Sequence, residues 1–269
     1  MIRPPFMIVI GTLSIGLVLF VAGRTAELRS VFLEDLSSDE LCIEMSAGYD
    51  RVLVFSGSVE ASGPHLALGK HNFRSQSYAE RIARELGNTL VAPIVPVAPT
   101  DEKLQRFAGT ISIRRDVFAD LNEDIVRSLV ATGFKDIILL SDHGGAQEPL
   151  RAVARRMDTA FKSKGVRIFF SSDGYEKSTQ EIVKYAQDHN LDAGGHGGLW
   201  DTSELWAVDP SAVRPDRLNL TDSLGAPSQG AGMVIGDPKL ASPELGRIFG
   251  NIRVKNAVAE IRTVLSSAR

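Results

Sequence analysis

The sequence predicts an α/β protein with three layers, in which helices cover both faces of a mostly parallel central sheet. Residues 51–55 and 136–140 are short and almost uniformly apolar, as is typical of strands buried on both faces. Segments with apolar residues at helical spacing alternate with such strands along the chain. This alternation is typical of a parallel sheet with helices on both faces.

The elements follow one another from residue 51 onward. After the first strand, residues 72–86 have apolar positions at helical spacing and end before Gly87, a favourable residue after a helix. The other elements are expected in this order: a strand at 89–97, a helix at 116–132 that ends at Gly133, a strand at 136–140, a helix to about residue 164, a strand at 166–170, a helix at 179–189, a helix opened by Asp201, and a last helix after Ser242.

The N-terminal residues differ from the rest of the chain. Residues 4–23 carry no charge and are rich in Ile, Leu and Val, and arginines lie at both ends of this run. This apolar run is longer than the core of a signal peptide and slightly shorter than a typical membrane span. Residues 1–23 are therefore expected to be either a cleaved export signal or a retained membrane anchor. Both alternatives place the remainder outside the cytoplasm, in the periplasm or anchored to the membrane. Residues 24–49 are expected to be a linker, and residues 50–269 one domain.

Composition excludes several classes of function. A formal net charge of -3 and a pI near 6.0 provide no general attraction to nucleic acid, and the chain has no basic arm. The single cysteine, Cys42, has no partner for an intrachain disulfide or a thiolate metal site, and we expect it to be a small buried residue. Contact with a membrane is expected only through the N-terminal segment.

Acidic and imidazole side chains gather in three glycine-rich segments. Glu60 follows the first strand and His143 follows the third, and open α/β sheets bind ligands at the carboxyl ends of their strands. The third segment, residues 194–203, contains His196 and Asp201. Imidazole and carboxylate together suit zinc, manganese or iron, which polarise carbonyl groups and activate water. Without a Gly-x-Ser-x-Gly or a phosphate-binding Gly-x-x-x-x-Gly-Lys motif, metal-activated water is the simplest mechanism.

The sequence resembles the creatininase (creatinine amidohydrolase) family over about residues 52–261. The motifs that carry the resemblance lie at residues 57–69, 109–112, 142–145, 196–203 and 235–238. The resemblance implies a three-layer α/β/α hydrolase that forms homo-oligomers, often hexamers. It also implies one or two divalent ions at the carboxyl ends of the strands, and cleavage of non-peptide carbon–nitrogen bonds in cyclic amides or formamides.

The resemblance implies a remodelled metal site. Glu60 matches the first acidic ligand, His143 matches the ligand of the His-Gly-Gly loop, and Asp201 stands where relatives often have a glutamate. His71 replaces the aspartate that bridges two ions in the family, and an imidazole cannot bridge as a carboxylate does. We therefore expect Glu60, His71, His143 and Asp201 to hold one divalent ion, with zinc favoured over manganese or iron.

Four further residues are expected to act beside the metal site. His196 matches a position assigned to proton transfer, which an ordinary pKa near 6.5 suits. His65 joins the catalytic set as a residue that orients a ligand. Trp200 could stack on a planar substrate ring. Ser62, where relatives usually have a histidine ligand, is a poor ligand and is grouped with the substrate-binding residues.

Three functions are consistent with these features. The first is an exported, metal-dependent amidohydrolase that uses activated water on a small cyclic amide, lactam or formamide-like compound. The second is a catalytically silent relative that keeps the pocket and binds a small ligand. The third is another metal-assisted reaction in the same pocket, such as an isomerisation or a deamination.

Overall fold

A four-stranded parallel sheet forms the centre of the protein. The computed structural model describes residues 29–220 and 234–267. The strands are β1 (Arg51–Ser56), β2 (Thr89–Val91), β3 (Asp136–Ser141) and β4 (Arg167–Phe170), in the order β2-β1-β3-β4. Val52 lies in register with Leu90 of β2 and with Ile137 of β3. The predicted parallel α/β architecture is confirmed.

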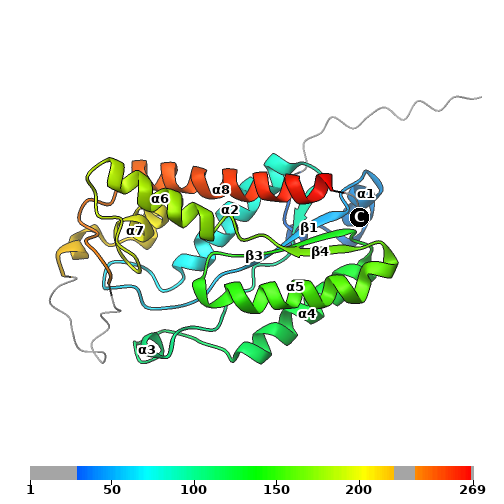
Figure 1. The fold of residues 1–269 in the computed structure, drawn as a ribbon, viewed down its shortest axis with the longest axis horizontal. Helices are drawn as coiled ribbons and strands as arrows, with labels where there is room; N and C mark the ends of the chain where they lie inside the picture. Colours follow the sequence, from blue (N-terminus) through cyan, green and yellow to red (C-terminus); the bar gives the residue numbers. More distant parts are fainter. Residues whose placement is uncertain (1–28, 221–233, 268–269) are drawn as a thin grey trace, which may run out of the picture.

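Helices cover both faces of the sheet (Figure 1). Helices α2 (Lys70–Leu86) and α8 (Pro243–Ser266) cover one face, and α4 (Arg115–Thr132) and α5 (Gln147–Phe161) cover the other. Alternate residues of the same strands supply the two cores. Leu53, Phe55, Ile138 and Leu140 pack with the α2 and α8 side, and Val52, Val54, Ile137 and Leu139 pack with the α4 and α5 side.

The remaining elements lie around these layers. Helix α6 (Glu176–Asp188) and helix α7 (Leu199–Val208) pack against α8. Shorter elements complete the described chain: α1 (Ser38–Ser46), α3 (Glu102–Gln105) and the 3-10 turns η1 (Leu33–Asp35), η2 (Gly144–Ala146), η3 (Lys162–Lys164), η4 (Pro210–Ala212) and η5 (Pro215–Leu220).

Local sequence signals set the ends of the long helices. Ser242 caps α8, because its hydroxyl accepts a hydrogen bond from the Leu245 amide at 3.2 Å. Helix α4 ends at Gly133, whose φ of 115° lies in the left-handed region that glycine adopts without strain. Both helix boundaries agree with the sequence prediction.

The second strand is shorter than predicted. It ends at Val91, whereas the sequence indicated a strand over residues 89–97. Pro93 and Pro96 lie in the remaining stretch, and proline cannot donate a hydrogen bond to a neighbouring strand. Val95 keeps one isolated bridge to Ser56, so this stretch still follows β1 beyond the regular strand.

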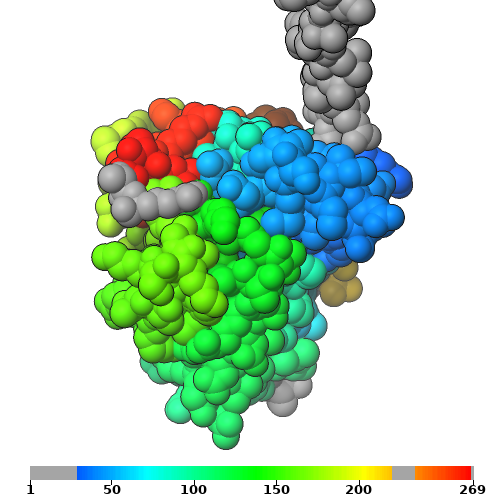
Figure 2. Space-filling model, turned by 90° about the vertical axis from the view of Figure 1, so that its right-hand side faces the viewer, coloured from blue at the N-terminus to red at the C-terminus, as the bar shows by residue number. Residues whose placement is uncertain are grey.

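The described part of residues 24–49 differs from the predicted linker. Phe32 is buried and forms a bridge to Val91 at the edge of the sheet. Ser37 caps α1 in a reciprocal capping box with Glu40. Figure 2 shows this blue part of the chain as a continuous portion of the surface. The linker prediction used only the polar composition of the segment and missed the contacts of its few apolar residues.

Two further expectations concern the same region. Cys42 is exposed on α1, so the prediction of a buried thiol is wrong, because α1 turns that position to the surface. The predicted signal or anchor at residues 1–23 lies outside the described residues. Within residues 29–220 and 234–267, no helix combines the length and the apolar character needed to cross a membrane.

Candidate metal centre

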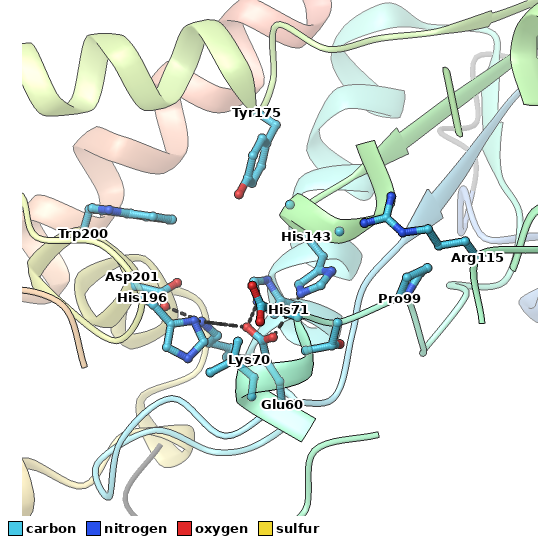
Figure 3. Close-up of a pocket in the computed structure, with 15 residues that line it drawn as sticks. Glu60, Lys70, His71, Pro99, Arg115, His143, Tyr175, His196, Trp200 and Asp201 are labelled. Atoms are coloured by element: carbon cyan, nitrogen blue, oxygen red, sulfur yellow. Dashed lines mark hydrogen bonds and ion pairs between the residues drawn. The ribbon is translucent and has the colours of Figure 1, made fainter. Parts of the chain in front are cut away.

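A cavity of about 350 Å³ opens where the loops after β1 and β3 meet helices α2 and α7. It is lined by Glu60, Lys70, His71, Pro99, Thr100, Asp101, Leu104, Arg115, His143, Gly144, Gly145, Tyr175, His196, Trp200 and Asp201. Most of the predicted site residues therefore come together. Figure 3 shows them projecting toward a common space.

Glu60, His71 and His143 form the centre of this site. Glu60 Oε1 lies 2.8 Å from His71 Nε2, and Glu60 Oε2 lies 3.0 Å from His143 Nε2. One ligand atom from each residue lies within 4.8 Å of the other two, and all three side chains are buried. Among the described residues, these three form the one group whose carboxylate and imidazole atoms are close enough to share a metal ion.

Three different elements bring these ligands together. Glu60 follows β1, and its amide donates a hydrogen bond to the Leu68 carbonyl at 3.0 Å, which closes the glycine-rich loop. His71 is the second residue of α2, at the end of that loop. His143 follows β3, and its amide is held by the Ser141 hydroxyl at 3.0 Å. The segments that follow two adjacent parallel strands thus bring Glu60 and His143 together, and their roles as metal ligands stay a prediction.

Asp142 orients His71 from behind. His71 Nδ1 lies 2.7 Å from Asp142 Oδ2, which also accepts hydrogen bonds from Arg74 Nε at 2.8 Å and Arg74 Nη2 at 2.6 Å. Asp142 therefore holds the Nδ1 side of the His71 ring, which directs Nε2 toward Glu60. Carboxylate–histidine pairs of this kind orient metal ligands in many proteins. A divalent ion therefore fits the cluster.

The charge states of the ligands also suit a metal ion. Burial would raise the pKa of Glu60, but hydrogen bonds from His143 and His71 outweigh it and hold the pKa below its usual range. Burial lowers the pKa of His143, although the hydrogen bond to Glu60 opposes this. An ionised carboxylate and a neutral imidazole are the forms that bind metal without first losing a proton.

Asp201 lies beside the cluster but is engaged by other groups. Its Oδ2 accepts hydrogen bonds from Lys70 Nζ and from the Gly197 amide, the latter at 2.8 Å. Its Oδ1 accepts from Arg74 Nη1 at 2.6 Å. Burial would raise its pKa, but the charges of Lys70 and Arg74 hold the pKa well below its usual range. The structure thus places Asp201 in ion pairs and outside the group that could share an ion.

Sequence reasoning missed Lys70 and Arg74. Both are buried on α2 and carry cationic groups into the site. Lys70 Nζ lies 3.6 Å from Glu60 Oε1, and Arg74 joins Asp142 to Asp201. A lysine beside His71 within a glycine-rich motif was the available signal. Helical spacing alone places such residues on a solvated face, whereas in the structure α7 and the segments after β1 and β3 pack against them.

His196, which the sequence analysis assigned to proton transfer, lies at the edge of the cluster. Its Nδ1 lies 3.4 Å from Glu60 Oε1, and its Nε2 lies 2.8 Å from the Ala61 carbonyl oxygen. Burial, with a smaller contribution from the charge of Lys70, lowers the pKa of His196 to about 4. The ordinary pKa expected from the sequence therefore does not apply. At neutral pH the imidazole is uncharged and can accept a proton at Nδ1.

His65 and Ser62 lie away from the cavity wall. His65 Nε2 lies 3.1 Å from the Gly197 carbonyl oxygen and 2.9 Å from Thr202 Oγ1, so it fastens the His196 loop to the start of α7. Ser62 is buried, and its hydroxyl has no hydrogen-bond partner within the described chain. Neither residue is among those that line the cavity.

Trp200 and Tyr175 form an aromatic side of the cavity (Figure 3). The guanidinium carbons of Arg74 and Arg253 lie 5.6 Å and 4.9 Å from the centre of the Trp200 ring system. These cations occupy ring surface that the sequence assigned to a substrate. Sequence reasoning did not identify Tyr175, which lies in the segment between β4 and α6. Burial raises the pKa of Tyr175 to about 12, so its hydroxyl is a hydrogen-bond donor at neutral pH.

A family comparison agrees with this geometry. The sequence profile of the family described as creatininase, or creatinine amidohydrolase, matches residues 34–261. The chain belongs to the creatininase family. The match begins within η1, so it includes part of the segment predicted to be a linker.

Individual creatininase relatives are distant. A creatinine amidohydrolase from Pseudomonas putida is 23% identical over 202 residues, which cover 71% of this chain and 76% of the relative. A 3-dehydro-scyllo-inosose hydrolase from Thermotoga maritima is 28% identical over 95 residues, which cover 35% of this chain and 30% of the relative. The second match therefore spans about a third of either protein.

Solved creatininase structures share the fold. A structure described as a manganese creatininase is 21% identical, with a TM-score of 0.70, and the match covers 89% of this chain and all of that one. A zinc–zinc form of a mutant creatininase is 22% identical, with a TM-score of 0.68 over 89% of this chain and all of that one. These likenesses establish the three-layer architecture of the present chain.

Proposed function

We propose that the protein hydrolyses a non-peptide carbon–nitrogen bond in a small cyclic amide, lactam or formamide-like compound. The coarser statement, a metal-dependent amidohydrolase family, follows from the family match. The convergence of Glu60, His71 and His143 at the wall of one cavity is the observation that carries the proposal. A cavity of about 350 Å³ fits a small substrate better than a polymer.

Six residues at the cavity have a role in the proposed reaction. Glu60, His71 and His143 hold the ion, for which zinc is favoured over manganese or iron. When bound, the ion supplies polarisation of the substrate carbonyl and increases the acidity of water. His196 accepts a proton at Nδ1 and returns it to the leaving nitrogen. Tyr175 donates a hydrogen bond from its hydroxyl and, with Trp200, restricts the cavity.

Metal-dependent turnover tests the proposal. Purified protein would be stripped of ions, reloaded with zinc, manganese or iron, and incubated with a panel of small cyclic amides, lactams and formamides. The assay would detect the ring-opened product of a cyclic compound, or the amine and formate from a formamide. We expect hydrolysis of at least one compound that depends on the ion. Glu60→Gln should abolish both ion uptake and hydrolysis.

A silent ligand-binding relative is the second candidate. It is favoured by one observation, the engagement of Asp201 by Lys70 and Arg74, which leaves this carboxylate less free to act on a substrate. Stoichiometric ion uptake and compound binding without hydrolysis across the panel would support it. Another metal-assisted reaction, such as an isomerisation or a deamination, would appear in the same panel as conversion to a product other than the hydrolysed compound.

We further propose that residues 1–23 direct export and that the protein assembles as a homo-oligomer, with a hexamer expected from the family resemblance. The apolar composition of residues 4–23 supports export. Cell fractionation would find the protein in the periplasm or in the membrane fraction facing outward. Recovery in the cytoplasm would contradict the export proposal, and a monomer by light scattering would contradict the assembly proposal.

A further inference from the structure

Lys70 is an unusual residue for its position. It is the first residue of α2, its side chain is 1% exposed, and it lines the cavity. A positive charge at a helix N-terminus is disfavoured by the helix dipole, and burial of an ammonium group is costly unless anions compensate it. The first turn of α2 contains no acidic residue that could do so. The compensation must come from the site itself.

The contacts of Lys70 resemble those of a bound cation. Nζ donates to Asp201 Oδ2 and lies 3.6 Å from Glu60 Oε1, so the ammonium joins two buried carboxylates that belong to different elements. Glu60 Oε1 also lies 3.4 Å from His196 Nδ1. Two carboxylates and an imidazole beside one space are the ligand types that zinc and manganese accept.

We propose that the Lys70 ammonium occupies the place of a second metal ion and limits the centre to one divalent ion. The proposal rests on the proposed function only in requiring that Glu60, His71 and His143 hold the first ion. Lys70 then acts as a positioning residue that fixes Asp201 and Glu60. It does so with a cationic side chain supplied by the protein itself.

The balance of buried charge supports this assignment. Four buried carboxylates, those of Glu60, Asp142, Asp201 and Glu204, share the region with the cations of Lys70, Arg74 and Arg253. Counting these seven groups alone, the set carries one excess negative charge. One divalent ion changes this sum to one excess positive charge, whereas a second ion would leave three excess buried positive charges beside an ammonium group.

Ion stoichiometry tests the proposal without reference to activity. Lys70→Met retains most of the apolar stem of the side chain and removes the charge. Stripped wild-type protein and the variant would be titrated with zinc by calorimetry, and their metal content would be measured after dialysis. We expect one equivalent for the wild type and an additional binding step, approaching two equivalents, for the variant. Manganese loading gives an independent signal, because two neighbouring manganese ions couple in electron paramagnetic resonance and a single ion does not.

Three controls define the outcome. Lys70→Arg keeps a cation and should bind one equivalent. Lys255→Met changes an exposed lysine on α8 and should also bind one. Lys70→Gln removes the charge but keeps a donor for Asp201, so it replaces Lys70→Met if that variant does not fold, and it should show the additional step.

Two results would overturn the proposal while leaving the proposed function intact. One is wild-type protein that takes up two equivalents. The other is a folded, neutral Lys70 variant that still binds only one ion and gives an uncoupled manganese signal. Wild-type protein that binds no ion after reloading would instead contradict the proposed function and remove the basis of this inference.

Discussion

At the residue scale, the geometry of the candidate metal centre depends on side chains outside the Glu60, His71 and His143 cluster. Asp142 lies 2.7 Å from His71 Nδ1 and is itself held by two hydrogen bonds from Arg74. Burial would raise the pKa of Asp142, but the charge of Arg74 and the hydrogen bond from His71 keep it below its usual range. The carboxylate therefore stays ionised and fixes which nitrogen of His71 faces Glu60.

Replacing Asp142 tests this orientation. Asp142→Asn should weaken zinc affinity by roughly 10- to 100-fold, because it removes the negative charge that orients and strengthens the His71 ligand. A competition titration against a chromophoric chelator measures the change. Asp188→Asn, an exposed change on α6, is the matched control and should leave affinity unaltered. Equal affinities for Asp142→Asn and the wild type would show that His71 is oriented in another way.

Substitution of His196 should affect turnover but not metal content, whereas substitution of a proposed ligand should affect both. His196→Ala should lower turnover by roughly 100- to 10,000-fold, the usual contribution of general acid–base catalysis, while metal content stays nearly unchanged. Glu60→Ala and His143→Ala should lose the ion together with activity. Metal analysis of all three variants beside their initial rates checks the difference. Loss of the ion from His196→Ala would make His196 a ligand, and unchanged turnover would remove its catalytic role.

Among the site residues, those that directly follow a strand were the easiest to predict from the sequence. The positions of Glu60 and His143 after β1 and β3 made their convergence predictable. Lys70, Arg74 and Tyr175 were missed, because their roles arise from packing between distant elements. Asp201 lies beside the predicted ligands, but Lys70 and Arg74 donate hydrogen bonds to its two carboxylate oxygens. No local sequence pattern indicates that these two cations are buried there.

At the element scale, the contact between α7 and α8 positions the third glycine-rich loop. Gly246 of α8 lies so close to α7 that a Cβ atom there would be 1.8 Å from the Ser203 carbonyl oxygen. Ser203 is in the same short helix as Trp200 and Asp201. Glycine at 246 therefore permits the approach of α8 to the helix that carries two residues of the cavity wall.

A methyl group at this contact should destabilise the protein. Gly246→Ala should lower the free energy of unfolding by about 1–3 kcal/mol, because the two backbones must separate and the core is overpacked. Gly250→Ala is the comparison on the same helix, where the nearest atom is the Tyr78 ring at 3.2 Å. Replacing glycine with alanine raises helix propensity equally at both positions, so the two variants differ only in the contact that the new methyl group makes. Gly250→Ala should therefore lose less free energy of unfolding than Gly246→Ala. Urea unfolding measures both values. A loss in Gly250→Ala as large as in Gly246→Ala would argue against a backbone contact at 246.

The sequence predicted most elements because their signals are local. Apolar spacing and a terminal glycine sufficed for α2 and α4, and Ser242 with the following proline indicated the start of α8. The second strand was overextended, because its apolar residues continue past prolines that end regular pairing. The sequence analysis did not predict that the segment before β1 packs against the domain. One buried residue, Phe32, attaches it to the edge of the sheet.

At the scale of the whole molecule, buried neutral histidines should make stability depend on pH. Burial lowers the pKa of His65 to about 4, although its hydrogen bond to the Gly197 carbonyl opposes the shift. In the unfolded chain the pKa is about 6.5. Between these values the unfolded state binds a proton that the folded state does not, so stability falls as the pH falls from about 6.5 to 4.

His65→Gln should reduce this pH dependence. From the two pKa values, His65 accounts for a loss of about 2 kcal/mol between pH 7 and pH 5 in the metal-free protein. Urea unfolding of wild type and variant at both pH values gives the two differences. The variant should lose about 2 kcal/mol less than the wild type. Identical pH dependence in the two proteins would show that His65 titrates normally in the folded state.

We expect Glu60, His71 and His143 to hold a single divalent ion. Crystals of the protein soaked in zinc, with data collected above and below the zinc absorption edge, would locate it. The expected result is one anomalous peak per chain, at about 2.0 to 2.2 Å from a Glu60 carboxylate oxygen and from Nε2 of His71 and His143. No peak at saturating zinc, a second peak beside Lys70, or a peak coordinated by Asp201 in place of these ligands would contradict it.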